Sequence, residues 1–329
     1  MRYRAWWSID WALSISSRKQ WHFIGAMGTE ERSLCCWIEM RKNGAIVGES
    51  FAEIHDVESE KYRERILNAL KARRLECTQN GGNLNSVNVF NLMDEMYVIN
   101  NFAEKAEAKS QSIVLDITSF PKRFFFLLLK AFVKSDKVRN LLVTYTSPDR
   151  YADDAPLYEN IESWKTLPGF AGANSKPSQW IISVGFLVES LRQYVGDNPD
   201  EKMKILLIPF PAPLATLRRT WESVANLDEN QQKNRFEKYL VDTLDMSAAF
   251  DRIKSFEGNP TQPLAFAPFG PKTTSAAMCL YALQRESSVH YPQPTVYHPD
   301  YSQGIRNNDP TKAVFVYWIK HEGEFLYAV

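Results

Sequence analysis

Short apolar segments alternate with helix-like segments along most of this chain. Trp21–Gly28 is followed by a helix opened by Thr29, and Ser112–Thr118 is followed by a helix over Pro121–Val133. Uninterrupted apolar runs of this length are typical of strands that are buried on both faces of a parallel sheet. The alternation therefore predicts an α/β fold with mostly parallel sheets flanked by helices. The other expected elements are strands within Ala45–His55, Ser86–Leu92, Asn140–Thr146, Trp180–Val184, Lys204–Pro209 and Leu264–Ala267, and helices at Ser59–Leu75, Met93–Lys109, Leu187–Val195, Pro213–Ala225 and Thr273–Leu283.

The sequence also matches itself at a nearly constant spacing, which predicts an internal duplication. The matched positions are Ile24, Gly28, Ser33 and Leu34 with Ile181, Gly185, Ser190 and Leu191, then Pro121-Lys122 with Pro271-Lys272, and then Pro148-Asp149-Arg150-Tyr151 with Pro299-Asp300-Tyr301. We therefore expect two similar Rossmann-like lobes, residues 1–155 and 178–329, joined by a turn-rich connection over 156–177. The second lobe is expected to carry a helical insertion near 228–256 and a terminal hairpin of Ala313–Lys320 with Glu324–Val329.

Composition excludes several classes of protein. The 39 basic and 39 acidic side chains cancel, so no net field attracts long nucleic acid or an anionic membrane. The longest apolar run, near Phe124–Val133, is too short to span a bilayer, and no signal peptide is visible. The four cysteines show no CxxC spacing, and the five histidines form no ligand cluster, so we expect reduced core thiols, a cytoplasmic protein, and no metal or cofactor.

The repeated lysines occupy positions that favour anions. In an open α/β sheet, ligands bind where the strands end and the following helices begin. Lys122 and Lys272 are expected in a first helical turn, after a proline at the first helical position. A cation there opposes the helix dipole unless an anion such as phosphate offsets it. Arg123 adds a second cation, and Gly270 lets the backbone approach closely. A solvated lysine on each helix is the alternative.

The turn after the first strand of the first lobe offers further candidates. Gly25 and Gly28 form neither a dinucleotide fingerprint nor a phosphate loop of the NTPase type, so dehydrogenase and NTPase functions are excluded. Thr29, Glu31 and Arg32 are expected in the same crevice, although an N-capped helix with a charged first turn explains them equally well.

Two further segments follow strand ends. Asp116 and Thr118 end a buried strand, where the carboxylate is either functional or bonded to nearby backbone. Tyr301 follows a Pro-Asp pair and offers an aromatic face to a base, unless the segment is simply a turn.

The turn Asp116-Ile117-Thr118-Ser119-Phe120-Pro121-Lys122 resembles that of the CRISPR-associated Rossmann fold, whose sensors carry an Asp-x-Thr-Gly-Gly-Thr-Lys type of turn between strand and helix. The duplication resembles SAVED-type sensors, which fuse two such lobes. The resemblance implies a crevice that binds cyclic or linear oligonucleotide second messengers during phage infection. Here Ser119-Phe120-Pro121 replaces Gly-Gly-Thr, and the resemblance implies signalling through a separate effector protein.

Three functions remain open at this point. The first is a ligand-sensing or accessory module of a bacterial defence system that binds a phosphate-bearing nucleotide or oligonucleotide. The second is an enzyme of the phosphodiesterase or glycosidase type that uses Asp116 or Glu31 as acid or base. The third is a protein-interaction scaffold. The candidate ligand-binding residues are Gly28, Thr29, Glu31, Arg32, Asp116, Thr118, Lys122, Arg123, Gly185, Gly270, Lys272 and Tyr301.

Overall fold

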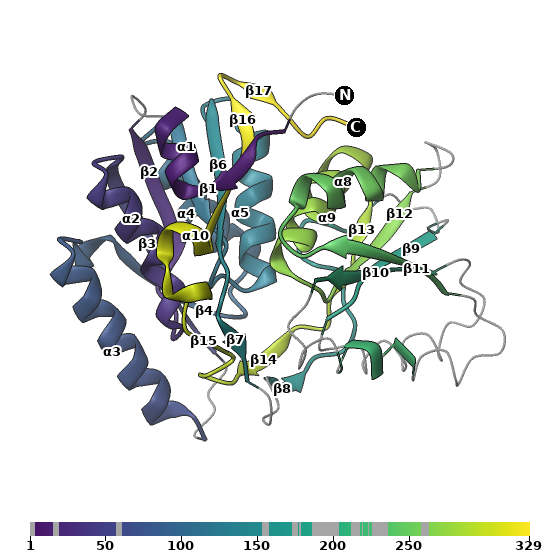
Figure 1. Ribbon diagram of the computed structural model, residues 1–329, viewed down its shortest axis with the longest axis horizontal. Helices are drawn as coiled ribbons and strands as arrows, with labels where there is room; N and C mark the ends of the chain where they lie inside the picture. Colours follow the sequence, from purple (N-terminus) through teal and green to yellow (C-terminus); the bar gives the residue numbers. More distant parts are fainter. Residues whose placement is uncertain are drawn as a thin grey trace. The chain divides into compact units, whose positions relative to one another are not determined.

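The computed structural model divides the chain into two compact units (Figure 1). The first unit comprises Met1–Ile161 and Pro294–Leu326, and the second comprises Glu162–Gln293 and Tyr327–Val329. The structure describes residues 4–15, 20–56, 61–152, 158–172, 177, 179–185, 204–211, 218, 220–222, 224–225, 236–257 and 263–329. The prediction that everything after residue 178 belongs to the second lobe is wrong for residues 294–326, because these residues return to the first sheet.

The first unit is built on a large sheet with the strand order β1-β16-β6-β5-β2-β3-β4. Strands β2 to β6 are parallel and take the doubly wound order 3-2-1-4-5 along the chain. The bounds of these strands are β2 Trp21–Ala26, β3 Ile46–His55, β4 Val87–Asn91, β5 Ser112–Asp116 and β6 Asn140–Thr146. The late strand β16 (Val314–His321) pairs antiparallel with β6 and with β1 (Trp6–Ser8). This return of the chain is the reason that the predicted domain boundary fails.

Helices cover both faces of the first sheet. On one face, Phe90 of β4 packs edge-on against Phe102 and Phe124. On the other face, the core holds Trp21, Trp37 and other side chains. The helices of the first unit are α1 Ile9–Ile15, η1 Glu31–Leu34, α2 Cys35–Lys42, α3 Arg63–Gln79, η2 Leu84–Ser86, α4 Met96–Glu107, α5 Lys122–Lys134, η3 Arg306–Asn308 and α10 Pro310–Ala313. The predicted strands and helices of this unit are thus present, with ends that differ by a few residues.

A buried histidine in β2 makes the first unit sensitive to acid. His22 is 2% exposed and its Nε2 lies 2.9 Å from Ser50 Oγ. Burial, and then the positive charge of Lys109, lower the pKa of His22 from 6.5 to about 4. The unfolded chain therefore binds a proton that the folded protein does not, and the stability present above pH 6.5 is lost as the pH falls toward 4.

We expect His22 to lower the free energy of unfolding by about 2 kcal/mol between pH 6.5 and pH 5. Urea denaturation of the wild type and of His22→Gln at both pH values measures this, because the variant keeps a polar group but cannot titrate. A variant with the same pH slope as the wild type would contradict the assignment.

The second unit contains a parallel five-stranded sheet in the described residues, with the order β11-β10-β9-β12-β13. Its elements are β9 Gln179–Ser183, β10 Lys204–Phe210, β11 Phe236–Asp242, α8 Met246–Ser255, β12 Leu264–Pro268, α9 Lys272–Arg285 and β13 Ser288–Val289. Along the chain these strands also follow the order 3-2-1-4-5. The predicted helix at Leu187–Val195 and much of the one at Pro213–Ala225 lie outside the described residues.

The helical insertion predicted near 228–256 is wrong in its described part, except for α8. Residues Phe236–Asp242 form β11, which pairs in parallel register with β10. Only Phe236 and Val241 of this strand are buried, while its charged residues are exposed. An exposed strand at the edge of a sheet carries enough polar residues to resemble a helix face in the sequence.

The last of the three self-matches does not relate the two units. The segment β7 (Arg150–Tyr151) pairs antiparallel with β15 (Ser302–Gln303), so both matched Pro-Asp segments lie in the first unit. The predicted terminal hairpin is present as β16 with β17 (Glu324–Phe325), but it too belongs to the first unit. A second short antiparallel pair joins β8 (Tyr158–Ile161) and β14 (Pro294–Tyr297).

Candidate functional site

The first sheet has its topological switch point between β2 and β5, where the chain leaves in opposite directions. The turns that follow these two strands touch: a Cβ added to Gly28 would lie 3.0 Å from the Cβ of Ser119. The Oγ of Ser119 is buried and has no hydrogen-bond partner within the described residues. Ser119 was not among the candidate residues, although its place between a buried strand and a helix start is a usable signal.

Hydrogen bonds of Asp116 and Thr118 fix the turn between β5 and α5. The backbone N–H of Thr118 donates to Asp116 Oδ1 at 3.1 Å, and the Thr118 hydroxyl donates to the same oxygen. Thr118 Oγ1 in turn accepts from the backbone N–H of Thr146 at 2.8 Å. Both side chains are buried. The arrangement therefore ties the end of β5 to the end of β6 and holds the turn in one conformation.

The helix that follows the turn begins one residue later than expected. Pro121 is the N-cap of α5, with φ −58° and ψ 150°, and its carbonyl accepts from Phe124 N and Phe125 N at 3.0 and 3.1 Å. The prediction of proline at the first helical position is thus wrong, because an extended ψ angle places Lys122 there instead.

The two cations in the first turn of α5 are Lys122 and Arg123. Lys122 is only 8% exposed, so the alternative of a solvated surface lysine is wrong for this residue. Arg123 Nη2 donates to the carbonyl of Asp94 at 3.0 Å. Arg123 therefore anchors the turn before α4, and Lys122 is the cation in the first turn beside Ser119.

The turn after β2 leads into η1 and not directly into an α-helix. Glu30 is the N-cap of η1, without a side-chain capping bond, so the expected cap at Thr29 is wrong. The Thr29 hydroxyl instead lies 3.5 Å from the carbonyl of Pro299.

Arg32 is a buried cation, 2% exposed, at the centre of a polar cluster. Its Nη2 lies 2.6 Å from Glu30 Oε2, and its Nε donates to Ser302 Oγ at 3.0 Å. Its Nη1 donates to the Thr146 carbonyl, and its guanidinium lies 5.4 Å from the centre of the Tyr145 ring. Burial by itself would lower the pKa of Arg32, but the charge of Glu30 raises it overall, so Arg32 stays charged. Arg32 therefore holds the Glu30 carboxylate in place and does not itself reach solvent.

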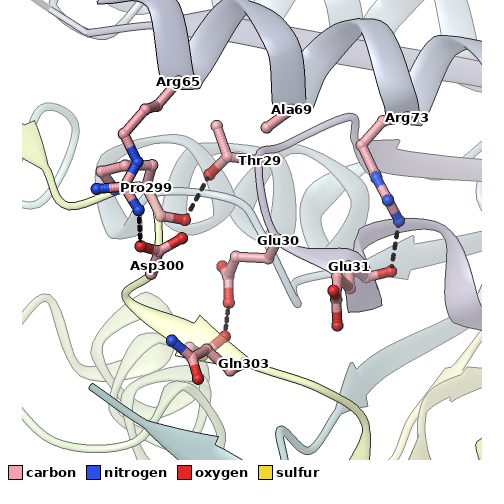
Figure 2. A pocket seen from close by; sticks show the side chains of 10 residues that line it. Thr29, Glu30, Glu31, Arg65, Ala69, Arg73, Pro299, Asp300 and Gln303 are labelled. Atoms are coloured by element: carbon pink, nitrogen blue, oxygen red, sulfur yellow. Dashed lines mark hydrogen bonds and ion pairs between the residues drawn. The ribbon is translucent and has the colours of Figure 1, made fainter. Parts of the chain in front are cut away.

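A pocket of about 220 Å³ opens beside this cluster, between η1, α3 and the segment before β15. It is lined by Thr29, Glu30, Glu31, Arg65, Ala69, Arg73, Pro299, Asp300, Ser302 and Gln303. Figure 2 shows Arg65 and Arg73 reaching down from α3, Arg65 to Asp300 and Arg73 to the carbonyl of Glu31. The candidate residues Thr29 and Glu31 thus line a cavity.

Sequence reasoning missed the two arginines of this pocket. Arg65, Ala69 and Arg73 are four residues apart, which places them on one face of a helix that the sequence did predict. That spacing is a signal which could have identified them.

Tyr301 lies next to the pocket but is packed among other tyrosines. Its ring meets Tyr151 edge-on at 5.8 Å and Tyr297 at 6.5 Å between ring centres. Burial raises the pKa of its hydroxyl. The ring is therefore part of an aromatic cluster behind Asp300.

The corresponding turn of the second unit has the same backbone form. Pro271 is the N-cap of α9, with φ −53° and ψ 150°, and Lys272 begins the helix. The two candidate glycines of this unit lie where its turns touch: a Cβ on Gly185 would lie 2.0 Å from the Phe269 carbonyl oxygen, and one on Gly270 would lie 1.9 Å from Ser183 Oγ. These glycines are thus required by the contact between two turns.

The candidate residues are divided between the units. Gly28, Thr29, Glu31, Arg32, Asp116, Thr118, Lys122, Arg123 and Tyr301 lie in the first unit, and Gly185, Gly270 and Lys272 lie in the second. The self-matched positions Ser190 and Leu191 fall outside the described residues. A shared cleft for Lys122, Arg123 and Lys272 stays a prediction.

Across the described part of the chain, no group of three or more His, Cys, Asp or Glu side chains could hold a metal ion. The same residues include no helix with both the length and the apolar character needed to cross a membrane. All four cysteines are buried.

Comparison with known proteins gives a likeness of fold. A solved structure described as a type III CRISPR defence DNA nuclease activated by cyclic oligoadenylate matches with a TM-score of 0.51 and 10% sequence identity. The match covers 83% of this chain and 65% of that one, so the chain spans less than two thirds of the length of this structure. No family model and no curated protein matches the sequence. At this level of identity, the comparison establishes an α/β fold shared with a CRISPR defence protein.

Proposed function

We propose that this protein is a nucleotide-binding sensor or accessory protein of a bacterial anti-phage defence system. In this proposal it is a tandem Rossmann-like protein of the CRISPR-associated or SAVED-like type, with lobes that arose by duplication. It binds a phosphate-bearing nucleotide or oligonucleotide and passes the signal to a separate effector protein. Support comes from the fold shared with a nuclease that is activated by cyclic oligoadenylate.

One observation supports this function more than the others. The Ser119 hydroxyl is a buried, unpartnered polar group within the described residues, and it stands two positions before Pro121, at the start of α5. The free N–H groups and the dipole of a helix of this length favour an anion at its N-terminus. A phosphate placed there would accept from Ser119, from the backbone and from Lys122.

The second unit repeats this turn in sequence and in backbone form. In both units a proline with a ψ of 150° precedes a lysine that opens the helix after the fourth parallel strand. This equivalence supports both the duplication and a second phosphate-binding position at Lys272. Gly270 provides a close approach to the Val184 backbone in the second unit, and Gly28 leaves room for the Ser119 side chain in the first.

Binding measurements test the proposal directly. We expect calorimetry with mono-, di- and cyclic oligonucleotides to identify a ligand that binds without turnover. Lys122→Gln, Lys272→Gln and Ser119→Ala should each weaken its binding, the lysine variants by roughly tenfold to a hundredfold, because a charge-assisted bond is lost. Lys137→Gln is the matched control, since Lys137 is exposed and pairs with Glu107 at 3.3 Å.

Each other outcome has a defined meaning. Equal binding by the control and by all three variants would place the ligand elsewhere. Hydrolysis of the bound oligonucleotide would favour an enzyme, and failure of every nucleotide to bind would refute a nucleotide sensor.

A further inference from the structure

The inner face of α3 carries two arginines with a small residue between them. Arg65, Ala69 and Arg73 line one wall of the pocket in Figure 2. At 1.5 Å per residue, the two arginines are separated by about 12 Å along the helix axis. The alanine between them leaves the space that makes up the cavity.

The arginines have more hydrogen-bond donors than the protein uses. Arg73 Nη1 binds Glu76 Oε2 at 2.6 Å and the Glu31 carbonyl at 3.1 Å. The Arg73 side chain is 17% exposed, and its Nε is buried without a hydrogen-bond partner within the described residues. A guanidinium offers five N–H donors in a rigid fork, and a buried donor without an acceptor is costly. Arg73 therefore keeps donor capacity that the described residues leave unmatched, beside the pocket that it lines.

The opposite wall shows which kind of oxygen fits. Arg65 Nη2 pairs with the carboxylate of Asp300, which belongs to the segment before β15. Glu30 and Glu31 also line the pocket: the Glu30 carboxylate is already matched by the buried Arg32, and Glu31 offers its carbonyl to Arg73. Asp300 thus occupies the position that the oxyanion of a ligand would take on Arg65.

We propose that this pocket is an oxyanion-binding site, with Arg65 and Arg73 as its cationic groups. A volume of about 220 Å³ is below the ~300–1,000 Å³ of sites for larger ligands, so the site takes a small anion or one anionic end of a longer molecule. Its ligand carries a phosphate or a carboxylate, and that group displaces Asp300 from Arg65. None of the pocket-lining residues belongs to the turn before α5, so the proposal does not rest on nucleotide binding there.

Variants with opposite expected signs test this site, with inorganic pyrophosphate and citrate as probes in calorimetry. Arg65→Gln and Arg73→Gln should weaken binding by roughly tenfold to a hundredfold, because a charge-assisted contact is lost. Asp300→Asn should strengthen it by roughly threefold to tenfold, because the competing carboxylate is removed from an exposed ion pair. Lys71→Gln removes the same charge from an exposed position of α3 outside the pocket lining and should bind as the wild type does.

The outcomes separate the possibilities. Binding of pyrophosphate alone supports a phosphate ligand, binding of citrate alone supports a carboxylate, and binding of both supports a general oxyanion site. If neither probe binds, or if Asp300→Asn and Lys71→Gln bind equally, the proposal is overturned. Asp300→Asn keeps the test decisive even if the Arg73 variant fails to fold.

Discussion

Replacing Arg32 with Met is expected to lower the free energy of unfolding of the first unit by about 3–5 kcal/mol, because buried oxygen atoms, one of them a carboxylate oxygen, lose the cation that they bind. Glu30 Oε2, Ser302 Oγ and the Thr146 carbonyl all bind this one guanidinium. Urea denaturation followed by tryptophan fluorescence measures the loss.

Two comparisons show whether the unpaired charge is the cause. The double variant Arg32→Met/Glu30→Leu should regain part of the loss, since a buried ion pair can be exchanged for apolar side chains at little cost. Arg139→Gln is the control for an exposed arginine, because Arg139 lies 3.9 Å from Glu322 at the surface, and it should cost less than about 1 kcal/mol. A double variant that is no more stable than the single one would refute this account.

Gly185→Ala is expected to destabilise the second unit by about 3 kcal/mol, at the upper end of the usual cost of overpacking. The new Cβ would lie 2.0 Å from the carbonyl oxygen of Phe269, and backbone cannot rotate away as a side chain can. One of the two turns must therefore move and disturb the ends of β9 and β12.

The equivalent position in the first unit provides the matched control. Gly28→Ala would meet only the Ser119 side chain, at 3.0 Å, so we expect a cost of about 1 kcal/mol or less. Hydrogen exchange of the amides in β9 and β12 reports on one unit, and that of β2 and β5 on the other. Equal exchange rates in wild type and Gly185→Ala would contradict the close contact of the two turns.

The parts of the fold that the sequence predicts well are those in which local pattern and burial agree. The middle of β5, Ile113–Leu115, is apolar on both faces because the strand lies inside a parallel sheet, and these residues by themselves predict a strand. β11 was missed because an edge strand keeps charged residues on its exposed positions. The placement of residues 294–326 was missed because no local signal tells to which of two sheets a returning strand belongs.

In the candidate site, too, the sequence identified the residues that have a local signal and missed those that depend on distant parts of the chain. Thr29 and Glu31 were identified because they follow a strand end, and they do line a pocket. Arg65 and Arg73 lie within a helix, where a basic residue is unremarkable until the loop around Asp300 is seen beside it. That loop arrives from more than two hundred residues further along the chain, a distance over which local spacing carries no information.

The return of the chain to the first sheet also sets an order of events during synthesis. The strand β16 lies between β1 and β6, yet it is translated only after Glu162–Gln293, which make up all of the second unit except Tyr327–Val329. Until then, among the described strands, β6 has an open edge and β1 has no strand to pair with, while β9 to β13 of the second unit have already been translated. Open strand edges favour aggregation, so translation pausing before residue 314 would lengthen the interval in which the nascent chain depends on chaperones.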